Sequence, residues 1–101
     1  MLAAFSVAPT TAQEDDDGSV ADAVAAAVKV VRDSGLPYEL TSMFTTVEGE
    51  WDEVFDVIRR ATEAVTATSS RVSLVVKADI RPGHTNQLTE KVQRITERLD
   101  A

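Results

Sequence analysis

Apolar residues recur along the chain with two different periods, and these periods predict its secondary structure. Spacings of three and four residues, which gather side chains on one face of a helix, begin near Ser19, Glu50 and Asn86. Short runs rich in apolar and β-branched residues, which are typical of strands, lie between them. The predicted strands cover residues 2–8, 38–42, 45–48 and 71–79. The elements therefore follow the order β-α-β-β-α-β, with a third helix at the C-terminal end.

Residues at the ends of the predicted helices favour starting or stopping a helix. Ser19 and Asp22 form a capping-box-like pair at the start of the first helix. Gly35 can adopt the left-handed conformation that ends this helix. Thr85 or Asn86 can cap the third helix. These signals support the helix boundaries that the apolar spacing predicts.

The strand predicted over residues 71–79 shows the clearest alternation of apolar and polar side chains. One of its faces carries Val72, Leu74, Val76 and Ala78. We expect this face to pack against the helices, because a continuous apolar face requires cover. The apolar stripe of the second helix should form part of the same core. That stripe contains Trp51, Val54, Phe55, Ile58, Ala61 and Val65.

This order of elements predicts an α+β fold, the ferredoxin-like βαββαβ sandwich with an extra C-terminal helix. Four antiparallel strands would carry two helices on one face of the sheet. The other face would be covered by the third helix, a partner subunit or a ligand. The length of 101 residues predicts a single domain over residues 1–101. An unpaired strand edge favours self-association, so we expect a homodimer or a homotetramer.

The charge of the chain narrows the possible partners. Seventeen acidic residues oppose ten basic ones, for a formal net charge of −7. Such a surface disfavours nucleic acid and anionic membranes and attracts a cationic small ligand. The same acidity is also explained as a general solubility trait. The apolar start of the chain is too short for a signal peptide or a membrane span, so we expect a cytoplasmic protein.

Few residues could support catalysis or metal binding. The chain has no Cys and a single His, His84, which follows Gly83 in a predicted turn. The four glycines are far apart, so no phosphate-binding loop is present. The acidic run over residues 14–17 lacks the spacing of a calcium loop and predicts a solvated loop. We therefore expect no enzyme activity, no metal and no cofactor.

Several stretches, taken in order, resemble the thiamine-binding, YkoF-like family of small ferredoxin-like proteins. The resemblance covers nearly the whole chain and is clearest in residues 34–40 (SGLPYEL), 48–54 (EGEWDEV), 71–73 (RVS) and 77–81 (KADIR), with Met43 and Thr45 between the first two. One departure is Phe44, which stands where the family usually has Gly and could reshape the mouth of a pocket. Others are Ala78 and Ile80 in the last strand.

The resemblance implies non-catalytic, cytoplasmic binding of thiamine or its hydroxymethylpyrimidine moiety by dimers that assemble into tetramers. The ligand-binding residues that it implies are Ser6, Thr45, Glu48, Lys77, Asp79 and Arg81. Alternative roles remain open for these residues. Glu48 can instead precede the break at Gly49 and serve the N-terminus of the second helix, and the three charged residues of the last strand and its end can instead form ion pairs between subunits. The alternative function is a structural protein whose open sheet face only mediates assembly.

Overall fold

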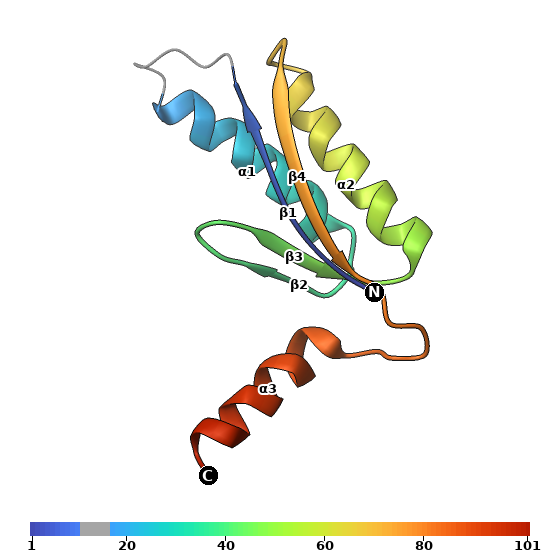
Figure 1. Cartoon of the computed structure of the whole chain (residues 1–101). Coiled ribbons are helices and arrows are strands. Elements are labelled where there is room, and N and C mark those ends of the chain that lie inside the picture. The colour runs from blue at the N-terminus through green and yellow to red at the C-terminus, as the bar shows by residue number, and fades with distance from the viewer. Residues whose placement is uncertain (11–16) are drawn as a thin grey trace.

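The computed structural model describes residues 1–10 and 17–101 (Figure 1). Its elements are β1 (Leu2–Pro9), α1 (Asp17–Asp33), β2 (Tyr38–Leu40), β3 (Thr45–Glu48), α2 (Trp51–Thr66), β4 (Val72–Asp79) and α3 (Gln87–Leu99). The strands form one antiparallel sheet in the order β2-β3-β1-β4. The predicted α+β ferredoxin-like arrangement is therefore confirmed.

The observed element boundaries are close to the predicted ones. β3 matches its prediction, and α1 begins at Asp17 rather than Ser19. Gly35 ends the first helical segment with a φ of 80°, in the left-handed region that was expected. Residues 14–16 of the acidic run lie outside the described residues, so the loop prediction there stays a prediction.

β2 is shorter than predicted because the chain turns immediately after it. The N–H of Thr41 donates to the carbonyl of Phe44 at 2.9 Å, and the Thr41 hydroxyl donates to the same carbonyl, also at 2.9 Å. These bonds close a tight turn over residues 41–44 and end the strand at Leu40. The turn becomes one wall of the candidate site.

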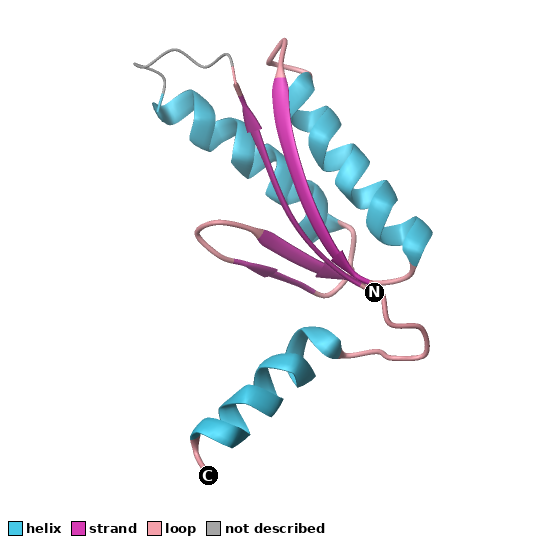
Figure 2. Cartoon of the chain, in the orientation of Figure 1, coloured by secondary structure: helices cyan, strands magenta, loops and turns pink. Residues whose placement is uncertain are grey.

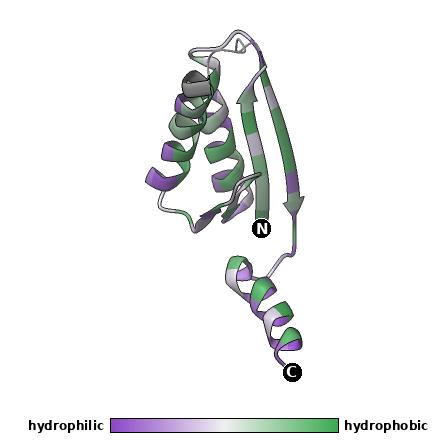
Figure 3. Cartoon of the chain, turned by 90° about the vertical axis from the view of Figure 1, so that its left-hand side faces the viewer, coloured by the Kyte–Doolittle hydropathy of each residue, from purple (hydrophilic) through white to green (hydrophobic). Residues whose placement is uncertain are grey.

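Helices α1 and α2 lie side by side on one face of the sheet (Figure 3). Successive strand residues point to opposite faces, so Ala3, Phe5 and Val7 of β1 all point toward these helices and are buried. Val31 of α1 and Val54 of α2 are fully buried against them. The core therefore lies between β1, the central strand, and the two helices.

The predicted burial of one β4 face is wrong for most of its residues. Phe5 pairs with Val76 across the strands, which places this face on the helix side as predicted. Leu74, Val76 and Ala78 are nevertheless exposed, and Val72 is only partly buried. The reason is that β4 is an edge strand and α2 packs mainly over β1.

The predicted stripe of α2 is buried except near its start. Trp51 is 54% exposed, because it opens the helix at one end of the sheet. Its ring packs against Phe55 with the centroids 4.8 Å apart. Trp51 was expected in the core, and this expectation is wrong; Val57, which was not expected there, is buried.

Helix α3 extends away from the rest of the molecule (Figures 1 and 2). It touches the base of the sheet and does not cover the open sheet face of its own chain. Its apolar stripe is exposed: Val92 and Ile95 by 59% and Leu99 by 78%. None of the helices in residues 1–10 and 17–101 has both the length and the hydropathy needed to cross a bilayer.

Candidate functional site

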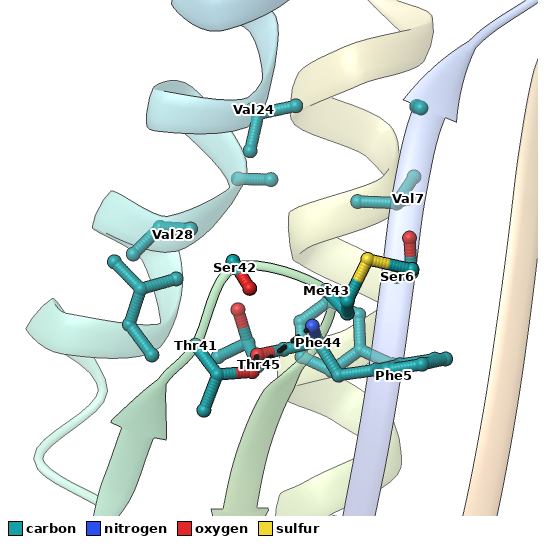
Figure 4. A pocket seen from close by; sticks show the side chains of 13 residues that line it. Phe5, Ser6, Val7, Val24, Val28, Thr41, Ser42, Met43, Phe44 and Thr45 are labelled. Carbon is teal, nitrogen blue, oxygen red and sulfur yellow. Dashed lines mark hydrogen bonds between the residues drawn. The ribbon is translucent and has the colours of Figure 1, made fainter.

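A cavity of about 160 Å³ lies between β1, α1 and the turn over residues 41–44 (Figure 4). Phe5 and Val7 contribute from β1, and Val24 and Val28 contribute from α1. The turn and the first residue of β3 complete the lining with polar groups. The cavity is therefore mostly apolar, and apart from Ser6 of β1 its polar side chains lie on the side of the turn.

The cavity exists because β3 is shorter than β1. β1 pairs with β4 along its whole length, from Leu2 to Pro9, but it pairs with β3 only as far as Phe5. The residues just before Thr45 in the chain, 41–44, form the turn and do not pair with β1. The cavity occupies the space beside β1 that a longer β3 would fill.

Several hydroxyl groups at the cavity are available to a ligand. Thr45 is only 6% exposed, and its side chain shares the helix-facing side of the sheet with Phe5. Within the described residues, the hydroxyls of Ser6, Ser42 and Thr45 make no hydrogen bond, although all three residues line the cavity. Ser6 is half-buried and Ser42 is exposed, and no fully buried side-chain oxygen of the described residues lacks a partner, so these hydroxyls are free to bond a polar ligand.

Phe44 lines the same cavity, in the turn between β2 and β3. Both backbone groups of Phe44 bond to the Thr41 hydroxyl: the carbonyl accepts from it, and the N–H donates to it at 3.3 Å. The residue that departs from the family pattern thus lies where it can narrow the cavity. Ser6 of β1 is thus brought together with Phe44 and Thr45, which follow one another about forty residues later.

Glu48 lies outside this cavity and holds helix α3. One carboxylate oxygen accepts the backbone N–H of Gln87 at 2.8 Å, and the other accepts the N–H of Leu88 at 3.1 Å. Asn86 is the N-cap residue, but its φ of 59° is left-handed and its side chain makes no capping bond. The carboxylate from β3 replaces that missing cap. A ligand role for Glu48 stays a prediction.

Lys77 and Asp79 lie on the open face of β4, opposite Ala4 and Leu2 of β1. Asp79 accepts a hydrogen bond of 2.6 Å from the Lys91 side chain of α3. This bond lowers the pKa of the Asp79 carboxyl below its ordinary value, and the charge of Lys91 adds to the effect. The ion pair is therefore made within the chain, and it gives α3 a second attachment.

Arg81 follows β4 and lines a separate cavity of about 280 Å³ with Trp51 and His84. The six predicted ligand-binding residues are thus divided among different places. Only Ser6 and Thr45 share the cavity beside β1. In the described part of the chain, no group of His, Asp and Glu side chains could hold a metal ion.

Comparison with known proteins assigns the chain to a family. The family model described as thiamine-binding protein matches residues 3–96. The chain belongs to the thiamine-binding protein family. That match includes β1, the turn over residues 41–44 and β3, which together form most of the cavity wall.

Curated relatives and solved structures match this thiamine-binding family member over most of its length. A UPF0045 protein of Mycobacterium bovis is 48% identical over 96 residues, which cover 94% of this chain and 90% of the relative. A hypothetical protein of Methanocaldococcus jannascii has the same fold, with a TM-score of 0.82, 28% identity and 95% of both chains covered. A Thermotoga maritima protein provisionally assigned to thiamine biosynthesis or salvage has a TM-score of 0.76 at 25% identity, covering 93% of this chain and 96% of its own.

The sequence did not identify every part of this family member's cavity. Val24 and Val28 of α1 belong to the apolar spacing that predicts the first helix, and nothing local distinguishes a cavity wall from a core stripe. Ser42 was not singled out. One signal could have revealed the cavity: the first predicted strand is longer than the third, which leaves part of its edge without a partner in a ferredoxin-like sheet.

Proposed function

We propose that this protein binds thiamine through its hydroxymethylpyrimidine ring in the cavity beside β1, without catalysing a reaction. The observation that carries the proposal is the set of unbonded hydroxyls at an apolar cavity, in a chain of the thiamine-binding family. The assignment of the Thermotoga maritima relative to thiamine biosynthesis or salvage points in the same direction.

The chemistry of the lining matches an aminopyrimidine ring. The ring is flat and largely apolar on its faces, which suits walls made by Phe5, Val7 and Val28. Its edge carries an amino donor and ring-nitrogen acceptors. The hydroxyl of Thr45, on the helix side of the sheet, can donate or accept a hydrogen bond, so it can satisfy either group. The Ser6 side chain lies on the opposite face of β1 from Phe5 and Val7, so its hydroxyl can meet the ligand only where the cavity opens past the end of β3. These two residues are the ligand contacts that we retain from the predicted set.

The size of the cavity favours one ring over the whole vitamin. A volume of about 160 Å³ is below the range of roughly 300–1,000 Å³ that is typical for drug-sized ligands. We therefore place the pyrimidine inside and the thiazolium ring at the mouth. A cation at the mouth is favoured by the net charge of −7.

A second candidate function is assembly without a ligand. The exposed stripe of α3 and the uncovered sheet face favour contacts with further copies of the chain. Lys77, Asp79 and Arg81 would then act between subunits or with a ligand held there. Assembly and ligand binding are compatible, so the experiment has to test binding itself.

Titration calorimetry with hydroxymethylpyrimidine, thiamine and thiamine diphosphate separates the two functions. We expect saturable binding of hydroxymethylpyrimidine and of thiamine, since both carry the aminopyrimidine ring. Absence of binding for all three compounds would contradict the proposal and leave assembly as the function.

A further inference from the structure

Val7 lines the cavity, and no motif in the sequence marks its main chain as part of a site. We propose that the backbone N–H and C=O of Val7 recognise the aminopyrimidine edge of the ligand. The N–H would donate to a ring nitrogen, and the C=O would accept from the adjacent amino group. This inference rests on the proposed function and names the group that reads the ligand's edge.

The direction of the Val7 main chain follows from bonds at the two ends of β1. In an antiparallel sheet, hydrogen-bonded and non-hydrogen-bonded residue pairs alternate along each pair of strands. The N–H of Thr10 donates to the carbonyl of Arg71 at 3.0 Å, so the main chain of Thr10 faces the β4 side. The N–H of Gly49 donates to the carbonyl of Met1 at 3.2 Å, so the main chain of Met1 faces the β3 side.

The bonds at the two ends of β1 agree on which neighbouring strand each residue's main chain faces, because the register with β4 runs without interruption from Leu2 to Pro9. The odd-numbered residues of β1 direct their N–H and C=O toward β3. Ala3 and Phe5 have partners there in Val47 and Thr45. Val7 is the next such residue, and it has no partner in β3 because the β1–β3 pairing ends at Phe5.

Val7 is therefore unusual for a core strand residue. It is only 6% exposed, it lines the cavity, and within the described residues its backbone shows no hydrogen bond outside the strand ladders. A nearly buried N–H and C=O without partners are costly, so a structure normally pairs them. The cavity is the space into which these two groups open, and a ligand there can satisfy both.

A strand edge and an aminopyrimidine edge are complementary. Each presents a donor beside an acceptor, and main-chain bonds of this kind supply the affinity when a peptide adds to a sheet edge. The ring would continue the ladder of β1 by one step beyond Phe5. In the 4-hydroxy counterpart of hydroxymethylpyrimidine, the keto form turns the donor into an acceptor and the ring acceptor into a donor. That compound would place a donor against the N–H of Val7 and an acceptor against its C=O, so neither hydrogen bond could form.

The test replaces Val7 by α-hydroxyisovaleric acid, which keeps the side chain and exchanges the N–H for an ester oxygen. The same exchange at Val76 is a matched control. By the same alternation, the N–H of Val76 faces the free edge of β4, so no ladder bond is lost there. Binding of hydroxymethylpyrimidine and of its 4-hydroxy counterpart is then measured by calorimetry for all three proteins.

We expect the Val7 ester to bind hydroxymethylpyrimidine about tenfold more weakly, which corresponds to roughly 1.4 kcal/mol, and the Val76 ester to bind it as the unmodified protein does. The unmodified protein should prefer the amino compound to its 4-hydroxy counterpart by at least a similar factor. Equal affinity of the Val7 ester and the unmodified protein for hydroxymethylpyrimidine would overturn this inference but not the proposed function. Absence of binding to the unmodified protein would remove the proposed function as well.

A second measurement covers the case in which the ester protein does not fold. In the unmodified protein, the Val7 amide proton should shift and its exchange should slow when hydroxymethylpyrimidine is added, because it gains a hydrogen bond. The Phe5 amide, which is already bonded in the ladder, serves as the internal control. A Val7 amide that stays unchanged while resonances of Thr45 and Val28 move would contradict the inference.

Discussion

The Glu48 carboxylate accepts the backbone N–H of Gln87 at 2.8 Å, across 39 residues of sequence. It also accepts the N–H of Leu88, so both of its oxygens are engaged at the start of α3. The helix has few other attachments to the sheet, of which the Asp79–Lys91 ion pair is one. Glu48 is therefore the residue that fixes where α3 begins and how it leaves the sheet.

Glu48→Ala should release the first turn of α3. Loss of a helix cap costs about 0.5–2 kcal/mol, and here the buried amide of Gln87 and the partly buried amide of Leu88 would also lose their acceptor. Hydrogen exchange of the Gln87 and Leu88 amides should accelerate accordingly. The control is Glu39→Ala on β2, an exposed carboxylate for which no hydrogen bond is seen within the described residues. Unchanged exchange at α3 in the Glu48 variant would show that another contact holds the helix.

Acid should weaken the folded state through its paired aspartates. Hydrogen bonds from Arg59 and Arg60 lower the pKa of Asp56, and Lys29 and Lys91 lower the pKa of Asp33 and Asp79. A carboxyl with a lowered pKa in the folded state contributes stability above its unfolded pKa and loses it as the pH falls through the folded pKa. The loss should therefore begin near pH 4, where unfolded aspartate titrates (about 3.9).

Asp56→Asn isolates this effect from the general titration of the surface. The variant should be less stable than the unmodified protein at pH 7, by a small amount because the pair is exposed and screened by salt. The difference should shrink as the pH falls from about 4 through the lowered pKa of Asp56, because the aspartate then becomes protonated. Urea unfolding midpoints from pH 7 to pH 3 measure it; a difference that persists at low pH would show that charge is not the cause.

Self-association should depend on the exposed stripe of α3. Ile95 is 59% exposed on a helix that does not cover its own sheet, so Ile95→Asp should weaken association. Gln93→Asp introduces the same charge away from the stripe and is the control. Sedimentation should show a dimer or tetramer for the unmodified protein and for the control, and smaller species for Ile95→Asp. A monomeric unmodified protein would contradict the predicted assembly.

The sequence predicts the fold well because its evidence is local. Apolar spacing and helix-ending residues such as Gly35 act within a few positions, and these elements appear where expected. Contacts between distant segments have no such signal. The third helix was expected to be capped by Thr85 or Asn86, its immediate neighbours, whereas the cap comes from Glu48.

Burial also depended on how the elements pack. An alternating pattern assigns Leu74 and Val76 to the correct face of β4, but it cannot show that α2 leaves this edge strand uncovered. The packing of the elements also separated the predicted ligand-binding residues, which the sequence had grouped into one site. Thr45 and Glu48 both belong to β3, yet their side chains point to opposite faces, so one lines the cavity and the other holds α3.

The neighbouring residues Thr45 and Thr46 offer the most direct test of the binding site. Their side chains alternate across β3, so only Thr45 lines the cavity. Thr45→Val removes a hydroxyl from the cavity, and Thr46→Val removes the same group from the other face. Loss of a neutral hydrogen bond costs about 0.5–1.5 kcal/mol, or roughly twofold to tenfold in affinity.

Calorimetric titration of hydroxymethylpyrimidine into the unmodified protein and these two variants is the decisive measurement. Saturable binding that weakens in Thr45→Val and is unchanged in Thr46→Val is the predicted result. Equal affinities in all three proteins, or a loss confined to Thr46→Val, would contradict the placement of the ligand in the cavity beside β1.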